Sequence, residues 1–357
     1  MIEFLSEWYR RHLSHPQAVI LVLLLFASFV VIFYFGHMIA PLLAALVLAY
    51  LLEGAVTNLE QRGLLRIVAV SIVFIVFVAL LAFLVVGLVP IVSRQFSNLV
   101  SDLPRMVSEG RQLLLQLPET YPNIVSAEQI EDVINDIRGV ISGFGQDVVT
   151  FSLSSIPVMI TVIIYLILGP VLVFFFLKDK QQLIVWLGSY LPNDREVLVQ
   201  VWREVDDQIG NYVRGKFYEI FIVGVTTYVT FALLGLSYAP LLAVLVGLSV
   251  IIPYIGAAVV TVPVAIAGYI QFGWGSEFIW VMVAYGIIQA LDGNLLVPLL
   301  FSDVVNLHPI AIIAAVLVFG GLWGFWGVFF AIPLATLVKS LLNAWPSNDA
   351  YVIQAET

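Results

Sequence analysis

Residues 252–256 read Ile-Pro-Tyr-Ile-Gly and interrupt an apolar stretch in the last third of the chain. Two similar interruptions follow: Asp-Gly-Asn at residues 292–294 with Pro298 behind it, and a glycine run within residues 320–327. In hydrocarbon every backbone N–H and C=O must be satisfied within the protein, so broken helices are tolerated only where they are buried or line a watery cavity. Paired Gly/Pro-interrupted segments are typical of a solute path in a membrane transporter. The pattern predicts a helical membrane fold and makes transport the leading hypothesis.

Composition places the chain in the membrane. Of its 357 residues, 61% are hydrophobic and 11% are charged, and the mean hydropathy is +1.05. Several uncharged windows reach about 20 residues, the length of a helix that crosses a hydrocarbon core of about 30 Å. The fold class is therefore an all-α polytopic membrane protein. The first apolar run has no small-residue cleavage site, so we expect a retained span and no signal peptide.

Charge and residue counts exclude several classes of function. A net charge of −9 argues against nucleic acid, which needs a clustered basic face. The chain has no cysteine, and no second histidine lies at ligand spacing from His308, so neither a thiolate nor a zinc site is expected. We also find no HExxH or GxSxG motif, and we expect neither an enzyme nor a cofactor.

Residues 210–216 match the first seven positions of a phosphate-binding loop. The next residue is Phe217 rather than a Ser or Thr that could hold magnesium, and no strand precedes the motif. We therefore expect no nucleotide. The segment is interpreted as an interfacial elbow, in which Arg214 and Lys216 lie at headgroup level and Gly215 permits close helix packing.

Hydrophobic periodicity predicts a series of membrane helices, some of them broken, and one extramembrane insert with two amphipathic helices. A tight hairpin with its break at Gly36-His37 is expected near the N-terminus. The predicted divisions are N-terminal membrane helices at 1–91, a periplasmic helical insert at 92–155, a membrane helix at 156–177, a cytoplasmic amphipathic segment at 178–216, a C-terminal membrane core with broken helices at 217–342 and a cytoplasmic tail at 343–357.

Lys and Arg in short loops near the spans indicate orientation, and they place both termini in the cytoplasm and the acidic insert outside. Two broken hairpins, at 240–271 and 310–342, would then enter from opposite faces and resemble an inverted repeat. Either hairpin could cross the bilayer fully or be re-entrant.

Asp292 is the leading site candidate, because a carboxylate within a span is expensive and usually faces a cavity. It shares a helix face with Gln289 beside Asn294, and it could bind a cation or exchange a proton; a helix cap is the alternative. The predicted solute or ion path comprises Asp292, Asn294, Gln289, Pro253, Tyr254, Gly256 and Pro298.

Secondary candidates lie after the path and on an earlier span. Asp303, Asn306 and His308 offer ligands to a hard cation, although a structural turn is favoured for His308 before Pro309. Glu219 lies three residues after Lys216, and a snorkelling ion pair accounts for it. The small residues Gly320, Gly321, Gly324 and Gly327 form stripes that would let helices pack or slide.

Eight landmarks, in this order, resemble the AI-2E transporter family and its PerM-like permeases. They are Trp-Tyr-Arg-Arg at 8–11, Leu-Ala-Tyr-Leu-Leu-Glu at 48–53, Leu-Lys-Asp-Lys at 177–180, Asn-Tyr-Val-Arg-Gly-Lys at 211–216, Ile-Pro-Tyr-Ile-Gly-Ala at 252–257, Gln-Ala-Leu-Asp-Gly-Asn-Leu-Leu-Val-Pro at 289–298, Asn-Leu-His-Pro at 306–309 and the glycine run at 320–327. The resemblance implies a bacterial inner-membrane protein of about eight membrane helices or half-helices, and a homo-oligomer such as a pentamer. The family name refers to export of the furanosyl signal autoinducer-2, and members are also linked to sodium or lithium exchange against protons. Many relatives have a contiguous Asp-Asn pair where this chain has Gly293 between Asp292 and Asn294.

Three functions are compatible with the sequence. The first is a secondary permease or exporter, without ATP hydrolysis, in which Asp292 is the coupling carboxylate for a small polar solute. The second is a Na⁺(Li⁺)/H⁺ antiporter of the same family. The third is an oligomeric membrane scaffold whose insert at 92–155 binds a partner. The partners expected are the lipid bilayer and a small solute or monovalent cation.

Overall fold

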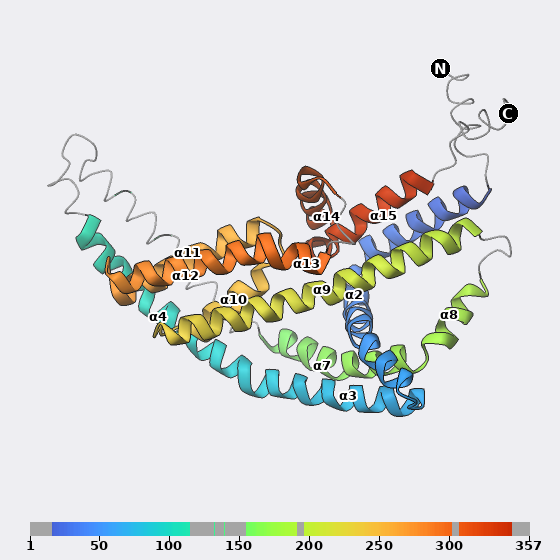
Figure 1. Ribbon diagram of the computed structural model, residues 1–357, viewed down its shortest axis with the longest axis horizontal. Coiled ribbons are helices and arrows are strands. Elements are labelled where there is room, and N and C mark those ends of the chain that lie inside the picture. The colour runs from blue at the N-terminus through green and yellow to red at the C-terminus, as the bar shows by residue number, and fades with distance from the viewer. Residues whose placement is uncertain are drawn as a thin grey trace, which may run out of the picture.

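The computed structural model describes residues 16–114, 132, 139, 155–190, 196–301 and 307–344, and these residues contain no strand (Figure 1). Within these described ranges, six helices are long and apolar enough to cross a membrane, or seven if one sharply bent pair counts as a single span. Together with a shorter apolar helix at Ala239–Ser249, they match the predicted all-α polytopic class.

The first two helical segments are longer than predicted. Helix α2 runs from Pro16 to Gln61 without interruption, so the expected hairpin break at Gly36-His37 is wrong. Figure 1 shows that α2 bends along its course, and Pro41 lies inside it. A proline within a helix removes one hydrogen bond and produces a kink, which is a smaller change than the reversal that the sequence suggested.

The second segment starts at α3 (Arg66–Phe83) and continues through a π-helical turn, η1 (Leu84–Leu88), into α4 (Val89–Leu114). The third predicted span therefore runs on into the first amphipathic helix of the insert, and no structural break occurs at residue 92. In the π turn the Val89 N–H bonds to the Leu84 carbonyl just before Pro90, whose ring would disturb a normal α turn. The second amphipathic helix of the insert falls almost entirely outside the described residues.

Helix α9 (Glu196–Leu233) joins two predicted segments, the amphipathic stretch and the fifth span, in one continuous helix. The expected elbow at Arg214, Gly215 and Lys216 is therefore wrong, since all three residues lie in mid-helix. Gly215 is buried against α13 (Val297–Phe301), where an added Cβ would come 2.8 Å from the ring of Phe301. The sequence also predicted close helix packing at Gly215, and the structure shows it between α9 and α13.

Two broken hairpins form the C-terminal core. The first consists of α10 (Ala239–Ser249) and α11 (Ile255–Phe272), and the second of α14 (Pro309–Phe329), which is kinked at Gly324, and α15 (Ala331–Ala344). Tyr254 and Gly324 have positive φ angles of 63° and 58°, so each break contains one left-handed residue. Beyond each break a glycine touches a carbonyl of the preceding arm: Gly256 touches that of Ser249, and Gly327 that of Phe319.

Between the hairpins the predicted interruption at residues 292–294 is a π turn within a helix. Helix α12 (Ser276–Leu291) continues through η2 (Asp292–Leu296) into α13. The Val297 N–H bonds to the Asp292 carbonyl, five residues back, and Pro298 follows. The segment Asp-Gly-Asn therefore widens the helix without ending it, for the same reason as at Pro90.

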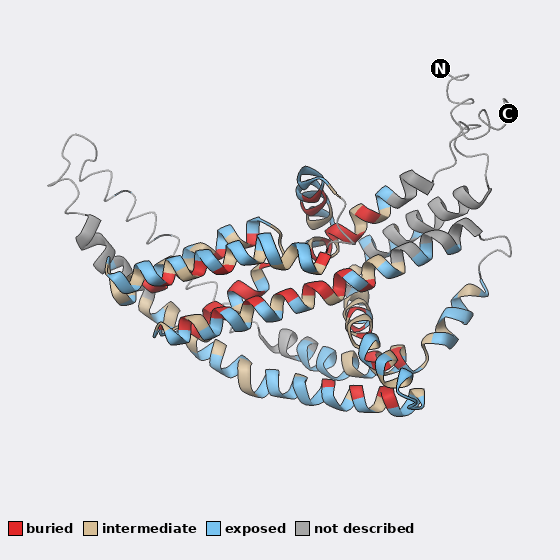
Figure 2. Cartoon of the chain, in the orientation of Figure 1, coloured by how far each residue is buried: buried red, intermediate tan, exposed pale blue. Residues whose placement is uncertain are grey.

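The spans expose apolar side chains outward. Figure 2 shows pale blue along most of α3, and Ile75 and Val86 are 66% and 76% exposed. The buried residues concentrate on α9 and on the faces of α2 and of the hairpins that surround it. In a membrane protein such exposed apolar faces are solvated by lipid, so the interior of the molecule is the face that α9 presents to the hairpins.

Candidate functional site

A buried ion pair lies in the middle of α9. Nζ of Lys216 is 2.6 Å from Oε2 of Glu219, and the two side chains are 4% and 3% exposed. Lys216 lies ten residues inside the candidate span Asp206–Leu233, which corresponds to a depth of about 15 Å along the helix. The predicted ion pair is present, but the predicted snorkelling is wrong, because neither charge reaches the helix end.

The tip of the first hairpin is held by the same lysine. Nζ of Lys216 donates a hydrogen bond of 2.9 Å to the carbonyl of Val250, which belongs to the break between α10 and α11. The ammonium group also lies 5.1 Å from the ring centre of Phe301 and 6.0 Å from that of Tyr212. A buried ammonium that has an acid, a carbonyl and two rings around it is well compensated.

Asp292 belongs to the same region. It occupies the first position of η2, sixteen residues into the candidate span Ser276–Phe301, and η2 packs against α9. Its carboxylate is within electrostatic range of both Lys216 and Glu219. The Oδ1 atom is buried and accepts no hydrogen bond from any described residue. Lys216, Glu219 and Asp292 are called the buried charge cluster below.

The second hairpin closes over this cluster. Tyr212, one turn before Lys216, contacts the ring of Phe301 at 5.7 Å and the ring of Phe329 at 6.1 Å. Ile251 and Ile252 of the first tip pack into clusters with Phe329 and Val328 of the second hairpin. The break of the first hairpin and Phe329, beyond the break of the second, therefore both pack against α9 within one turn of Lys216.

A second polar arrangement supports the first hairpin from the other side. The hydroxyl of Tyr285, on α12, donates to the carbonyl of Ala257 at 2.9 Å, and Thr261 donates to the same carbonyl at 2.7 Å. Lys216 and Tyr285 thus satisfy backbone carbonyls at both ends of the break. This is the condition under which a broken helix is stable at membrane depth.

The remaining residues of the predicted path differ in how far they are buried. Gln289 is half-buried on α12, and Pro253 is half-buried at the first tip, whereas Tyr254 and Pro298 are exposed. The amide of Asn294 donates to the Ala290 carbonyl of its own helix at 2.8 Å, so in this structure it satisfies the π turn rather than Asp292. Among the glycines, Gly327 is buried at the contact with Phe319, Gly320 is half-buried, and Gly321 and Gly324 are exposed.

Of the secondary candidates, Asp303 and Asn306 lie outside the described residues. His308 is the N-cap of α14, where its Nδ1 accepts a hydrogen bond from the Ile310 N–H at 3.3 Å. This contact accounts for His308 as a structural residue. Within the described part of the chain, no three His, Asp or Glu side chains are grouped as metal ligands.

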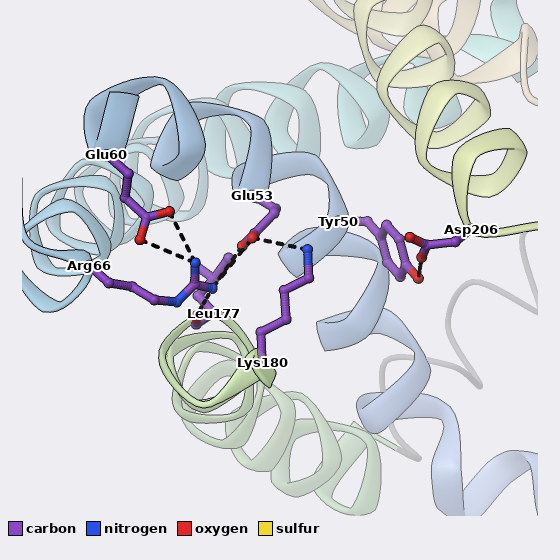
Figure 3. Close-up of polar contacts among 7 residues, drawn as sticks. All are labelled: Tyr50, Glu53, Glu60, Arg66, Leu177, Lys180 and Asp206. Atoms are coloured by element: carbon purple, nitrogen blue, oxygen red, sulfur yellow. Dashed lines mark hydrogen bonds and ion pairs between the residues drawn. The ribbon is translucent and has the colours of Figure 1, made fainter. Parts of the chain in front are cut away.

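The sequence did not single out a charged network at one end of the spans (Figure 3). Arg66, at the start of α3, donates to the Leu177 carbonyl at 2.5 Å and pairs with Glu53 at 3.3 Å and Glu60 at 3.1 Å. Lys180 pairs with Glu53 at 3.1 Å. We call Glu53, Glu60, Arg66 and Lys180 the junction cluster, because it joins α2 and α3 to the end of α7 (Ser155–Lys178).

Nearby, the Tyr50 hydroxyl donates to Asp206 and links α2 to α9 (Figure 3). Two of the residues in Figure 3, Glu53 and Lys180, end landmarks that carried the family resemblance. These two landmarks were therefore the available signal that Glu53 and Lys180 have a role. They did not reveal the contact, because the two residues are more than a hundred positions apart and no local sequence pattern pairs them.

The opposite end of the spans has its own polar contacts. The Tyr238 hydroxyl, in the turn before α10, donates a hydrogen bond to Oδ2 of Asp102 at 2.6 Å. Burial of the hydroxyl and this hydrogen bond raise the pKa of Tyr238 to about 12. The Gln95 side chain accepts from the Leu241 N–H at 2.9 Å. Asp102 lies 36 residues beyond Arg66 on one helical segment, or about 54 Å away. Polar contacts therefore fasten both ends of the spans, with the buried charge cluster between them.

These features define a multi-pass α-helical membrane protein with two broken hairpins, the first of which is bound at its tip by a buried charge. A family model described as AI-2E family transporter matches residues 19–347, and the chain belongs to this family. It is 49% identical over 349 residues to the "Putative permease PerM" of Escherichia coli (strain K12), covering 98% of this chain and 99% of that protein. It is also 26% identical over 341 residues to the "Putative transport protein YueF" of Bacillus subtilis (strain 168), covering 92% of each.

Proposed function

We propose that the chain is a secondary permease that moves a small polar solute, with its path at the meeting point of the two hairpin tips. The observation that carries the proposal is the position of the buried charge cluster in mid-span, against the break of the first hairpin. Ionisable groups at such depth are expensive, and in membrane proteins they are typical of substrate or ion paths. The family and the names of the relatives are in agreement, since all describe transport.

The charges of the cluster favour a particular kind of solute. With both carboxylates ionised, Glu219 and Asp292 carry two negative charges against the single positive charge of Lys216. Glu219 is paired by Lys216, and an oxygen of Asp292 has no hydrogen-bond donor among the residues that the structure describes. A solute that brings hydrogen-bond donors or one positive charge would satisfy this oxygen. Asp292 is therefore the proposed solute-binding residue, and Lys216 is the proposed link to the hairpin tip.

Two flux measurements on full-length protein in proteoliposomes test the proposal. Vesicles loaded with labelled autoinducer-2, the furanosyl solute of the family name, report solute efflux, and vesicles with a trapped pH dye report the response to sodium or lithium pulses. Each is made on wild type, on Asp292→Asn, and on Glu277→Gln as a control for another acid on the same helix. Glu277 is exposed in the first turn of α12, far from the cluster.

Solute efflux that is lost in Asp292→Asn and kept in Glu277→Gln supports the permease. A sodium- or lithium-dependent pH change with the same dependence on Asp292 shows instead that the site exchanges cations for protons. Flux that is equal in all three proteins removes Asp292 from the path. No flux of either kind in wild type overturns the proposal and leaves the scaffold hypothesis.

We further propose that the chain lies in the bacterial inner membrane with the junction cluster on the cytoplasmic side and with residues 92–155 outside. The positive charges near the spans support this orientation. The homo-oligomer that the family resemblance implies is part of the same proposal. Thiol labelling of single-cysteine variants in whole cells tests the orientation, and native mass spectrometry of the detergent-solubilised protein tests the oligomer.

A further inference from the structure

Helix α8 (Lys180–Gly188) lies at a sharp angle to the membrane helix before it. Helix α7 ends at Lys178, and the chain bends by 77° across Asp179 before α8 begins. The nine residues of α8 span about 13 Å, so a bend of 77° leaves an advance of only about 3 Å along the α7 direction. Helix α8 therefore runs nearly perpendicular to α7 (Figure 1).

The junction cluster gives the level in the membrane at which this bend occurs. Lys180, the first residue of α8, pairs with Glu53, and Arg66 binds the carbonyl of Leu177 in the last turn of α7. Charged side chains that gather at the ends of several spans mark the boundary between hydrocarbon and headgroups. Because α8 starts at this boundary and turns across α7, it follows the plane of the membrane surface.

The surface of α8 is apolar and uncovered. None of its residues is buried, and Val185, Trp186 and Leu187 are 71%, 56% and 58% exposed. Just beyond the helix, Tyr190 is 74% exposed and packs edge-to-face on Trp186 at 5.5 Å. In water these side chains would form an exposed apolar patch, which monomeric soluble surfaces rarely carry.

We propose that α8 is an interfacial helix that lies in the boundary between headgroups and acyl chains of the protein's own membrane. Trp and Tyr are the residues enriched at this depth, because their rings are apolar and their tips are polar. The order of residues along α8 also fits, since Lys180 belongs to the junction cluster, the polar residues Gln181 and Gln182 follow it, and the apolar run comes after them.

Lipid is favoured over a second copy of the chain for two reasons. The apolar side chains of α8 are exposed around the helix rather than in one stripe, and a fluid surrounding can solvate all sides of a helix. Helix α8 also continues directly from α7, whose Ile163, Ile167 and Val171 are exposed apolar residues. The proposal does not depend on which solute the protein moves.

Spin labels on single cysteines test the proposal, and the chain has no native cysteine that would interfere. Val185→Cys and Leu187→Cys are compared with Ile75→Cys, which is exposed in the middle of α3, and with Arg203→Cys, which is exposed near the start of α9 before its candidate span. In liposomes of full-length protein, each label's collision rate is measured with oxygen, which partitions into lipid, and with a water-soluble nickel chelate.

We expect both α8 labels to collide more with oxygen and several-fold less with nickel than the label at Arg203, at a depth between the two references, about 5–10 Å into the boundary. Nickel collision equal to that at Arg203 would place α8 in water and overturn the proposal. Protection from both reagents would also overturn it, because it would show that protein covers the helix, as in a contact between copies. Elution of each variant as a single species like wild type confirms that the label has not unfolded the protein.

Discussion

Nζ of Lys216 lies 2.6 Å from Oε2 of Glu219, one turn later on α9, and the same Nζ donates to the Val250 carbonyl at the tip of the first hairpin. Burying two charges is costly, and a buried pair persists only where additional partners satisfy the remaining hydrogen-bonding capacity. Here the tip of a broken helix supplies one of those partners. The pair thus links the charge in mid-membrane to the geometry of the break.

Removing one member of this pair should destabilise the protein strongly. Lys216→Met leaves Glu219 buried without its counter-charge and the Val250 carbonyl without a donor, and we expect a loss of about 3–5 kcal/mol. The double variant Lys216→Met/Glu219→Leu should recover most of this loss, since a pair of apolar residues carries no desolvation cost. Unfolding of the detergent-solubilised proteins, followed by tryptophan fluorescence, measures both.

The exposed pair Lys178–Asp179, at 3.3 Å, is the control. Lys178→Met should cost less than about 1 kcal/mol, because the Lys178 side chain is 41% exposed and water screens the interaction. A single Lys216→Met variant as stable as Lys178→Met would show that the buried pair is not held as the structure describes.

The contact between α9 and α10 depends on two glycines that allow the backbones to approach closely. A Cβ on Gly247 would come 3.0 Å from the Ile220 carbonyl and 3.1 Å from the Gly224 Cα, and neither backbone atom can move aside cheaply. Gly247→Ala should therefore cost about 1–3 kcal/mol through overpacking. Gly286→Ala, on α12, meets nothing within 4 Å and should be neutral or stabilise by up to about 1 kcal/mol. Thermal unfolding of the two variants checks the difference, and equal midpoints would contradict the close approach.

The junction cluster should make a measurable contribution although it lies at an end of the spans. Arg66 is 26% exposed, and one side chain binds a helix carbonyl and two carboxylates on neighbouring elements. We expect Arg66→Ala to cost about 1–3 kcal/mol, mainly because the Leu177 carbonyl and Glu53 lose a donor.

Glu60→Gln is the matched change, since it removes one charge from the edge of the same network and should cost less than about 1 kcal/mol. Unfolding in low and high salt separates the contributions. The effect of Glu60→Gln should shrink in salt, whereas most of the effect of Arg66→Ala should persist. An Arg66→Ala effect that disappears in high salt would mean that the carbonyl contact contributes little.

Much of the fold could be predicted because the apolar periodicity and the Gly/Pro interruptions are local signals. The breaks at Tyr254 and Gly324 each need a left-handed residue, and the sequence marks both with glycine or proline nearby. The errors at Gly36 and Gly215 have a common cause. A glycine inside a helix costs about 1 kcal/mol relative to alanine, which lowers helix stability without ending the helix where packing holds it.

The candidate site could be predicted only in part. Asp292 and Glu219 stood out as acids within apolar spans, and the structure places both near Lys216. The hydrogen bond from Lys216 to Val250 joins residues 34 positions apart, and that from Arg66 to Leu177 joins residues 111 apart. Such contacts depend on how whole helices pack, so periodicity and motif spacing do not reveal them.

The link between Tyr238 and Asp102 should be constant over the physiological pH range. The pKa of Tyr238 is raised to about 12 from its ordinary value near 10, so the folded state holds the phenolic proton more tightly than the unfolded chain does. The resulting stabilisation is fully present below about pH 10 and is lost as the pH rises through about 12. Tyr238→Phe removes the hydrogen bond and should cost about 1 kcal/mol. Between pH 6 and pH 9, thermal unfolding should show the same difference from wild type at every pH.

Tyr190→Phe is the control for this prediction, because Tyr190 is 74% exposed and the change also removes one hydroxyl. Its unfolding midpoint should match that of wild type. A Tyr238→Phe midpoint equal to that of wild type at every pH in this range would show that α4 is not held against the turn before α10 by this hydrogen bond. A constant difference, with Tyr190→Phe unchanged, would identify the contact as one that fastens this end of the spans.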